Sequence, residues 1–358
     1  MKSKFWIPGI LSMMLSGCAP LTRQQISESN ARSLIDSILY LASLAGNSHN
    51  TQPWKVELLP QNHFRLYADT TRKLKVVDAS GRGVFISLGA FIENFEQAAG
   101  IYGYTVQTEY KALRAEDILV AEMVLIEGTP SGLSPEVIKD RRTLRGNFSV
   151  SPLQTQDLEH LLEGTQGVHY YPLNSREGKY IAEMTVQAYT QQATHTKAQA
   201  ELQKWIRFSN RDAAQHQDGL TTAGMEIRGL AGFMVSRFFS PEDSRKSSFV
   251  RKGIDKTSAQ VNHCGGWIVI TGAENRPADW LKTGQTYEKI NLRCRGLKLG
   301  IHPMNQILEE KPYEDKAAEF LNLEGTLQFI ARIGYTETYP EAVSLRRKPE
   351  EFILPKAK

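Results

Sequence analysis

Two short segments carry most of the side chains that could do chemistry. In the first, five consecutive residues offer hydrogen-bonding side chains, and Pro53 and Trp54 close the run: Ser48, His49, Asn50, Thr51 and Gln52. Side-chain amides present a donor and an acceptor side by side, which suits a flat heteroaromatic ring with alternating N–H and C=O groups along one edge. The alternative is a polar helix-to-strand connection with Asn and Ser as caps. Caps alone do not account for five polar residues followed by Pro-Trp.

The second segment is IKDRRTLRGNF, residues 138–148. Arg141, Arg142 and Arg145, together with Thr143, place three guanidinium groups and a hydroxyl within five positions. Guanidinium forks bind phosphate in a bidentate manner and stay charged when partly desolvated. A solvated basic turn is the ordinary alternative, and both interpretations stay open at this point.

The N-terminus has the pattern of a targeting segment. Lys2 and Lys4 precede an apolar stretch, Phe5 to Leu15, that is too short to span a bilayer. The following Leu15-Ser16-Gly17-Cys18 resembles the lipobox of bacterial lipoproteins, which implies a signal peptide at 1–17 and acylation of Cys18. Because Ala19 follows the cysteine, the resemblance implies a lipid anchor in the outer membrane, facing the periplasm. An ordinary cleaved signal, or merely an apolar start, is the alternative.

Composition excludes several classes of function. The chain has 358 residues, 41% of them hydrophobic, with a scattered net charge of +4 and no basic helix interleaved with aromatics, so no nucleic-acid partner is expected. No cysteine or histidine pattern predicts a metal site. Cys264 and Cys294 could pair in an oxidising compartment or remain two buried thiols.

The elements that position the two segments follow from periodicity. Helices are expected at 31–44, 84–99, 151–164 and 279–299, and the region 177–255 is expected to be largely helical. Strands are expected at 54–60, 63–69, 118–128, 168–173, 266–272 and 327–335, the first two forming a hairpin around Gln61-Asn62. The order helix, strand, long helix ending in glycine, strand thus occurs twice. Segments 88–104 and 283–301 match in pattern, although coincidence of common patterns would explain this equally well.

The two segments together resemble a known family. NSHNTQPW resembles the S-x-N-x-Q-P-W loop of the FMN-dependent nitroreductase superfamily, and RRTLR resembles its arginine motif at the flavin. The tail RIGYTETYPEAVSLRRKPEEF, residues 332–352, is similar to the family's C-terminal segment. With the Asp218-Gly219-Leu220 region in a helical insertion, the pattern resembles the Acg-like branch of FMN-binding nitroreductase-like proteins, over the chain after about residue 30.

The resemblance implies a nitroreductase-like α+β fold. Family members are homodimers whose flavin sites combine the arginine motif and the Q-P-W loop of different subunits. Here the first half has the Q-P-W loop and the second has the arginine motif, which implies two degenerate halves fused as a pseudo-dimer with one complete site. The resemblance divides the chain into a signal peptide at 1–17, a tether at 18–30, an N-terminal half at 31–130, a C-terminal half at 131–336 with an insertion at about 177–255, and a tail at 337–358.

The resemblance also assigns the site. Ser48, His49, Asn50, Gln52, Arg141, Arg142, Thr143, Arg145, Arg346 and Arg347 are the expected FMN contacts, with the arginines at the phosphate and the ring edge. The implied activity passes two electrons or a hydride through FMN, from a small-molecule donor to a nitroaromatic or quinone-like acceptor. No catalytic side chain is predicted, and a monomer acting as a pseudo-dimer is expected.

The insertion leads to an alternative function. Its bulky apolar residues could form a lid over the flavin or simply the core of extra helices: Trp205, Phe208, Phe233, Met234, Phe238 and Phe239. A lidded flavin would indicate a protein that sequesters or stores FMN without turnover.

Overall fold

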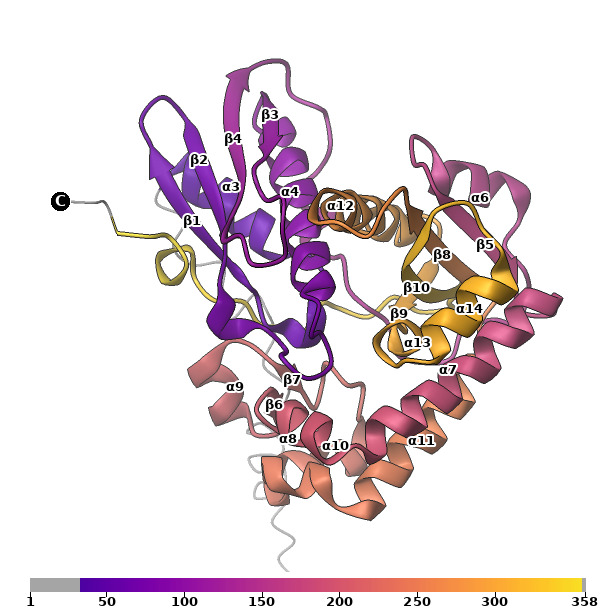
Figure 1. Ribbon diagram of the computed structural model, residues 1–358. Helices are drawn as coiled ribbons and strands as arrows, with labels where there is room; N and C mark the ends of the chain where they lie inside the picture. The colour runs from indigo at the N-terminus through magenta and orange to yellow at the C-terminus, as the bar shows by residue number, and fades with distance from the viewer. Residues whose placement is uncertain (1–32, 356–358) are drawn as a thin grey trace, which may run out of the picture.

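The computed structural model describes residues 33–355, so the expected signal peptide, Cys18 and the whole tether lie outside the described residues. Two four-stranded antiparallel sheets stand at opposite sides of the molecule, and a long helix from each half lies between them (Figure 1). A group of further helices covers one end. The expected mixed α+β arrangement is confirmed.

The first half builds the sheet β1-β2-β4-β3. Its elements are α3(Leu34–Ser43), β1(Trp54–Leu59), β2(His63–Ala68), α4(Arg82–Ile101), β3(Tyr104–Tyr110) and β4(Leu119–Glu127), with 3-10 turns at Ser48–Asn50 and Thr70–Arg72. The predicted β1–β2 hairpin is confirmed, and Gln61 and Asn62 take the positive φ that a tight hairpin turn requires. Trp54 is fully buried against Phe91, so it fixes the start of β1 to α4.

The second half repeats this topology as β5-β8-β10-β9. Its elements are α5(Glu136–Lys139), α6(Thr155–Leu162), β5(Val168–Pro172), β8(Gly266–Gly272), α12(Pro277–Cys294), β9(Leu299–Pro303), α13(Gln306–Glu309), α14(Tyr313–Leu321) and β10(Thr326–Tyr335). In both halves the chain order is strand, strand, long helix, strand, strand, and the last two strands exchange places in the sheet. The shared topology agrees with the repeat that the sequence pattern suggested, and fusion of two degenerate halves stays a prediction.

The insertion lies between the first two strands of the second half, where the first half has only a hairpin turn. It comprises α7(Arg176–Thr194), α8(Thr196–Gln203), α9(Asn210–His216), α10(Gly229–Phe238) and α11(Ser247–Val261). A 3-10 turn at Pro241–Arg245 and a short parallel pair, β6(Ile206–Arg207) and β7(Leu220–Thr221), complete it. The expectation of a largely helical region is confirmed.

The two halves meet where α4 crosses α12. A β-carbon on Gly89 would lie 2.0 Å from the carbonyl oxygen of Leu281, and one on Gly284 would lie 2.0 Å from that of Ile86. Each contact thus joins a glycine to the residue three positions before the other glycine. This reciprocity is what a two-fold relation between equivalent helices produces. Only glycine allows the helices to approach so closely.

The segments that follow β4 and β10 link the two halves. The chain after β4 crosses to the second half, where Leu144 N donates to Ile301 O (3.2 Å). The chain after β10 returns to the first half, where Val56 N donates to Phe352 O (2.9 Å) and a bridge joins Val56 to Ile353 (Figure 1). The arginine motif therefore lies against β9 of the second half, to which it belongs, and the tail is delivered to the first half.

Some sequence predictions were wrong. Helix α12 ends at Cys294, not at Gly300, and Leu299–Pro303 is a strand. The strand Tyr104–Tyr110 was not predicted, although its alternating exposure is typical of an edge strand. Cys264 and Cys294 are two buried free thiols, which settles the alternatives left open for them. No helix among the described residues is long and apolar enough to cross a membrane, and no group of three His, Cys, Asp or Glu side chains there is arranged to hold a metal ion.

Candidate functional site

A cavity of about 900 Å³ lies where the two halves and the insertion meet. This volume is within the range of sites that hold a cofactor or a drug-sized ligand. The first half contributes the loop at 46–49 and the start of α4, and the second contributes Thr143, Arg145, Tyr287 and residues 302–306. Four of the ten predicted contacts therefore share one cavity wall: Ser48, His49, Thr143 and Arg145.

The loop that follows α3 is held in an unusual backbone conformation. His49, Asn50 and Gln52 have φ values of 49°, 54° and 52°, in the left-handed region that bulky residues rarely adopt. Surrounding hydrogen bonds impose this shape, among them Gln52 N to Asn47 Oδ1 (2.8 Å) and Ser48 N to Ser87 Oγ (3.2 Å). Strain of this kind persists where the structure over-determines it, and it is typical of ligand sites.

A buried acidic residue anchors the same loop to α12. Glu288 accepts a hydrogen bond from Gly46 N (3.1 Å) and lies 3.0 Å from Arg141 Nε. A β-carbon on Gly46 would come within 2.8 Å of the Tyr287 ring, so glycine is needed for this approach. Burial raises the pKa of Glu288, and Arg141 opposes that shift. Arg141 thus ties the arginine motif to the loop from the first half.

The cavity wall combines cationic groups with neutral imidazoles. Burial lowers the pKa of Arg145, but the guanidinium remains a cation at neutral pH, and Lys256 lies close enough for the two charges to repel. Burial and, next, Arg145 lower the pKa of His49 to about 4, so this imidazole is neutral at pH 7. The part of the wall around Arg145 and Lys256 therefore favours an anionic group without a protonated histidine, whereas Asp78, Glu201, Glu309 and Glu314 place carboxylates elsewhere in the lining.

His302 is a cavity residue that sequence reasoning missed. Arg332 is fully buried and donates from Nε to His302 Nδ1 (3.2 Å), which leaves the ring proton on Nε2. Burial and then Arg332 hold the pKa of His302 well below its ordinary value. His302 is thus a neutral imidazole with one N–H to donate. The strand Leu299–Pro303, which carries His302, was not predicted, because the sequence was read as a helix up to residue 299.

Several buried polar atoms of the cavity residues have no hydrogen-bond partner among the described residues. They are His49 Nδ1, Gln306 Oε1 and Gln328 Oε1. Unpaired buried polar atoms are costly, and in native proteins each has a cause such as a ligand or a bound water. Two amide acceptors and an imidazole beside cationic groups match a ligand that carries N–H and C=O groups and a negative charge. The residues present therefore fit FMN.

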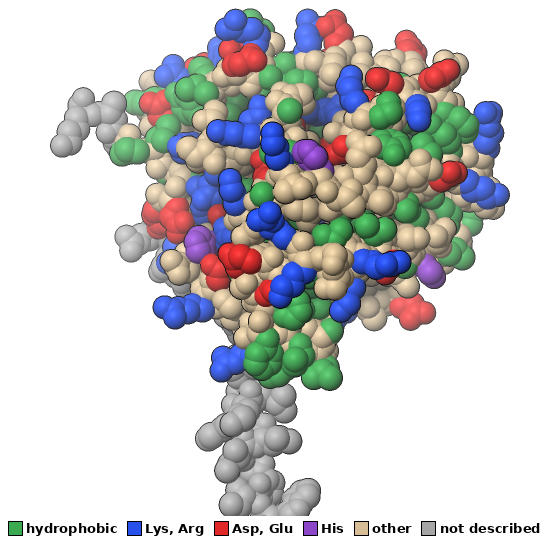
Figure 2. Space-filling view, turned by 60° about the horizontal axis from the view of Figure 1, so that its bottom comes forward, with side chains coloured by type: hydrophobic (Ala, Val, Ile, Leu, Met, Phe, Trp, Pro, Cys, Tyr) green, Lys and Arg blue, Asp and Glu red, His purple; other side chains and the backbone are tan. Residues whose placement is uncertain are grey.

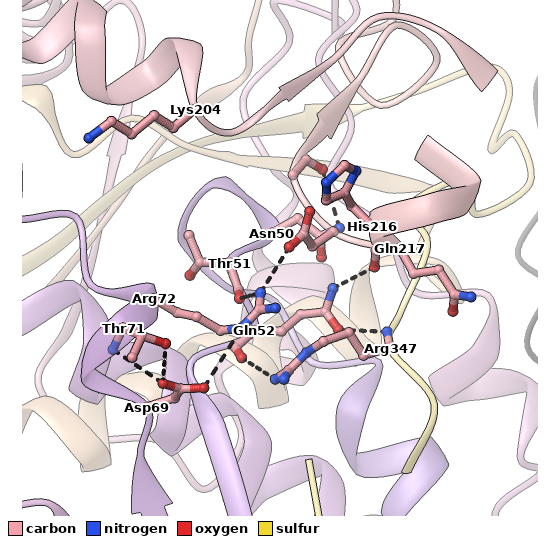
Figure 3. A network of polar contacts seen from close by, with 12 residues as sticks. Asn50, Thr51, Gln52, Asp69, Thr71, Arg72, Lys204, His216, Gln217 and Arg347 are labelled. Atoms are coloured by element: carbon pink, nitrogen blue, oxygen red, sulfur yellow. Dashed lines mark hydrogen bonds and ion pairs between the residues drawn. The ribbon is translucent and has the colours of Figure 1, made fainter. Parts of the chain in front are cut away.

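Four predicted contacts turn away from the cavity into a network between the loop, the tail and the insertion (Figure 3). Gln52 donates from Nε2 to Gln217 O (2.8 Å) and accepts from Arg347 N (2.8 Å). Arg347 donates in turn to Gln52 O (2.6 Å). Asn50 donates to Gly219 O (3.2 Å) and accepts from Arg346 (2.7 Å), whose guanidinium also donates to three backbone carbonyls of residues 43–45.

Arg141 and Arg142 do not line the cavity either. Arg141 is buried and donates to Leu44 O (2.6 Å) besides its pair with Glu288. Arg142 donates to Glu341 O of the tail and lies 3.2 Å from Glu226 of the insertion. The structure thus brings Asn50, Gln52, Arg141, Arg142, Arg346 and Arg347 together as a frame that shapes the loop. Contact of all ten predicted residues with FMN stays a prediction.

The insertion forms much of the remaining wall. Tyr189, Phe249 and Lys256 line the cavity from α7 and α11. Among the bulky apolar residues singled out in the sequence, Phe239 lines the cavity, whereas Phe208 is buried among the insertion's own aromatics, against Phe239 and Phe249. Phe208 therefore fits the core alternative, whereas Phe233, Met234 and Phe238 are exposed and belong to neither. A lid over a flavin stays a prediction.

An ion pair fastens the insertion to the first half. Asp218 lies 2.9 Å from both Arg72 and Arg207. Arg72, which Figure 3 labels together with Thr51, also donates to Thr51 O (2.9 Å). Gly219 N donates to Asn50 O (3.1 Å) from the next position. The polar loop therefore serves as the surface on which the insertion docks.

The comparison with protein families is decisive. The model of the Nitroreductase family matches residues 138–335, more than half of the chain. This chain belongs to the Nitroreductase family. No curated protein matches it.

Solved structures with a similar fold are also nitroreductases or nitroreductase-like. A nitroreductase-like family protein from Bacillus cereus has 14% identity and a TM-score of 0.34, covering 62% of this chain and 95% of its own. The FMN-dependent nitroreductase NfnB from Mycobacterium smegmatis, in complex with NADPH, has 15% identity and a TM-score of 0.36, and the match covers 58% of this chain and 92% of that protein. A nitroreductase described as putative, from Anabaena variabilis, has 10% identity and a TM-score of 0.36, and the match covers 85% of this chain and 88% of that protein.

Proposed function

We propose that the chain is an FMN-binding oxidoreductase of the nitroreductase type, which passes two electrons or a hydride to a small nitroaromatic or quinone-like acceptor. The observation that carries the proposal is the meeting of His49 from the first half and Arg145 from the second in one cavity. Neither half supplies the complete wall by itself.

The residues that would hold FMN follow from the cavity wall. Arg145 and Lys256 would face its negative charge, and the unpaired atoms of His49, Gln306 and Gln328 would meet its polar edge. When bound, FMN supplies the hydride chemistry, so this chain needs no side-chain acid or base for it. Arg145 would stabilise negative charge that develops on the ring, because the site is partly desolvated and the cation is fixed in place.

The repeated topology supports the proposal that one chain replaces a dimer, with one complete site. Helix α6 ends at Leu162 and β5 begins at Val168, so the second half has only a short loop where the first has the ten residues 44–53. The equivalent site of the second half therefore lacks its polar loop. This favours a monomer acting as a pseudo-dimer, and placement in the Acg-like branch belongs to the same proposal. Analytical ultracentrifugation tests it, and a stable dimer would contradict it.

We also propose that the protein is anchored by an acylated Cys18 and faces the periplasm from the outer membrane. The support is the lipobox-like Leu15-Ser16-Gly17-Cys18 in the sequence. Mass spectrometry of the membrane-extracted protein tests this, since acylation after cleavage removes residues 1–17 and adds the mass of fatty acyl chains. Recovery of an unmodified N-terminus would contradict the anchor.

A protein that holds FMN without turnover is the second candidate. It is favoured by the insertion, which lines the cavity from α7, α8, α10 and α11 and is fastened to the loop through Asp218. A ligand beneath such a cover would be shielded from acceptors. The two candidates predict the same cofactor and differ only in its reactivity.

One experiment separates them. The purified chain is loaded with FMN, and NADH or NADPH is added without oxygen, followed by a nitroaromatic or a quinone. Bleaching of the flavin absorbance and its return with the acceptor support the oxidoreductase. If photochemical reduction also fails to yield a flavin that the acceptor reoxidises, the holding function is favoured. A chain that takes up no FMN overturns both.

A further inference from the structure

Helix α10, Gly229–Phe238, is a largely solvent-exposed helix of the insertion. Gly232 is its one buried residue, and four large apolar side chains are exposed. Leu230 is 77% exposed and Phe238 is 65% exposed, and Phe233 and Met234 lie between them. A helix normally turns its apolar stripe toward the core, so this outward stripe marks an interaction surface.

The two sides of α10 have different neighbours. Successive residues of a helix are rotated by about 100°, so Phe233, Arg237, Leu230, Met234 and Phe238 occupy one arc of about 140°. All five are exposed. Ala231, Val235 and the following Phe239 continue around the helix and line the cavity. Helix α10 is therefore a wall with the cavity on one side and solvent on the other.

Basic residues accompany the apolar arc. Between residues 226 and 256, against four Asp and Glu in the whole segment, five Lys and Arg lie outside the cavity wall: Arg228, Arg237, Arg245, Lys246 and Arg251. Arg237 lies within the arc itself, and neither it nor Arg245 nor Arg251 makes an ion pair among the described residues. The face to which the insertion contributes shows hydrophobic side chains gathered at its lower edge, with Lys and Arg around them (Figure 2).

We propose that the outer face of α10 docks onto an anionic phospholipid bilayer. Exposed Phe and Leu on one face, with unpaired cations beside them, is the composition of a helix that lies in a membrane interface. The apolar side chains would enter the boundary between headgroups and acyl chains, and the cations would meet lipid phosphates. Because the same helix lines the cavity, docking would place one wall of the cavity against the membrane.

The test places a fluorophore on α10. A full-length chain with Cys18→Ser and Phe238→Cys is labelled with an environment-sensitive NBD thiol reagent, which selects the new cysteine because Cys264 and Cys294 are buried. The matched control is Ile126→Cys, at a residue 47% exposed near the end of β4, far from α10 in Figure 1. Vesicles contain either equal parts of phosphatidylglycerol and phosphatidylcholine, or phosphatidylcholine alone.

With the anionic vesicles, the fluorescence emission of the label on residue 238 is expected to shift to the blue and to be quenched by spin-labelled lipid. The emission of the label on residue 126 is expected to stay unchanged. No shift at residue 238, or equal shifts at both positions, would overturn the proposal. A shift at residue 238 that needs no vesicles and grows with protein concentration would show a second copy as the occupant instead.

A charge variant tests the electrostatic part. In the chain labelled at residue 238, Arg237→Gln is expected to lower partitioning onto anionic vesicles by about fivefold, the effect of one basic residue near such a surface. Partitioning onto phosphatidylcholine alone should not change. Equal partitioning of both chains onto anionic vesicles would overturn recognition of the lipid charge.

Discussion

Replacing Gly89 by alanine tests how the two halves pack against each other. The new β-carbon would lie 2.0 Å from the carbonyl oxygen of Leu281, whereas carbon and oxygen in contact stay about 3.3 Å apart or more. The obstacle is backbone, so no side-chain rotation relieves it, and α4 must separate from α12 by about 1 Å. Overpacking costs about 1–3 kcal/mol, and alanine's helix propensity returns up to about 1 kcal/mol. We expect the free energy of unfolding to fall by about 2 kcal/mol.

The control is Gly100→Ala in the same helix. Its β-carbon would meet Ser131 at 3.5 Å, an ordinary contact, so we expect a gain of about 0.5–1 kcal/mol. Gly284→Ala should lose as much as Gly89→Ala, because its β-carbon would lie 2.0 Å from Ile86 O. The double variant should lose less than the sum, since one separation relieves both contacts. Urea unfolding followed by tryptophan fluorescence measures all four. Equal stability of the Gly89→Ala and Gly100→Ala chains would refute the packing.

Three further predictions follow from buried ionisable groups. Glu288→Gln removes the negative charge that lies 3.0 Å from the Arg141 guanidinium, so we expect the free energy of unfolding, measured with urea, to fall by about 3–5 kcal/mol. Glu93 is the control, because its nearest cation, Lys289, is 4.0 Å away. A fall for Glu288→Gln that is no larger than for Glu93→Gln would contradict this. Burial raises the pKa of Glu96 from 4.5 to about 7, so the folded chain should lose stability relative to Glu96→Gln as pH rises through this range. Urea unfolding at pH 4, 6 and 8 checks this, and a difference that does not grow with pH would be evidence against it. Cys264 and Cys294 are buried, and burial raises the pKa of the Cys264 thiol to about 11. Ellman's reagent should therefore label these two cysteines only in denaturant. Rapid labelling of the native Cys18→Ser chain would contradict their burial.

The sequence predicted the elements with a strong local signal. Alternation and a Gln-Asn turn predicted the first hairpin, and apolar spacing predicted α4. The edge strand Tyr104–Tyr110 was missed because its polar residues alternate without a strongly apolar face. The end of α12 was placed too late because the apolar spacing continues through Leu297 and Leu299 into the next strand.

For the candidate site, the sequence predicted which residue types gather in the loop but not which of their side chains reach the cavity. Residue types in the Q-P-W loop indicated a polar surface, but the direction of each side chain depends on the backbone. Positive φ at His49, Asn50 and Gln52 sends the first to the cavity and the other two to the tail and the insertion. Lys256 and His302 reach the cavity from segments far away in the sequence, so local spacing gave no sign of them.

The most direct test of the account is the affinity of the folded chain for FMN, measured by quenching of flavin fluorescence. Wild type should bind, and Arg145→Ala should bind about 10–150-fold more weakly, because one charge-assisted contact of about 1.5–3 kcal/mol is lost. Arg65→Ala, at a partly exposed arginine outside the cavity wall, serves as the control and should bind like wild type. Unfolding of each variant is measured in parallel, because Arg145 also donates to Gly224 O (2.8 Å). Absence of FMN binding by wild type, or equal affinity of wild type and the folded Arg145→Ala chain, would contradict the account.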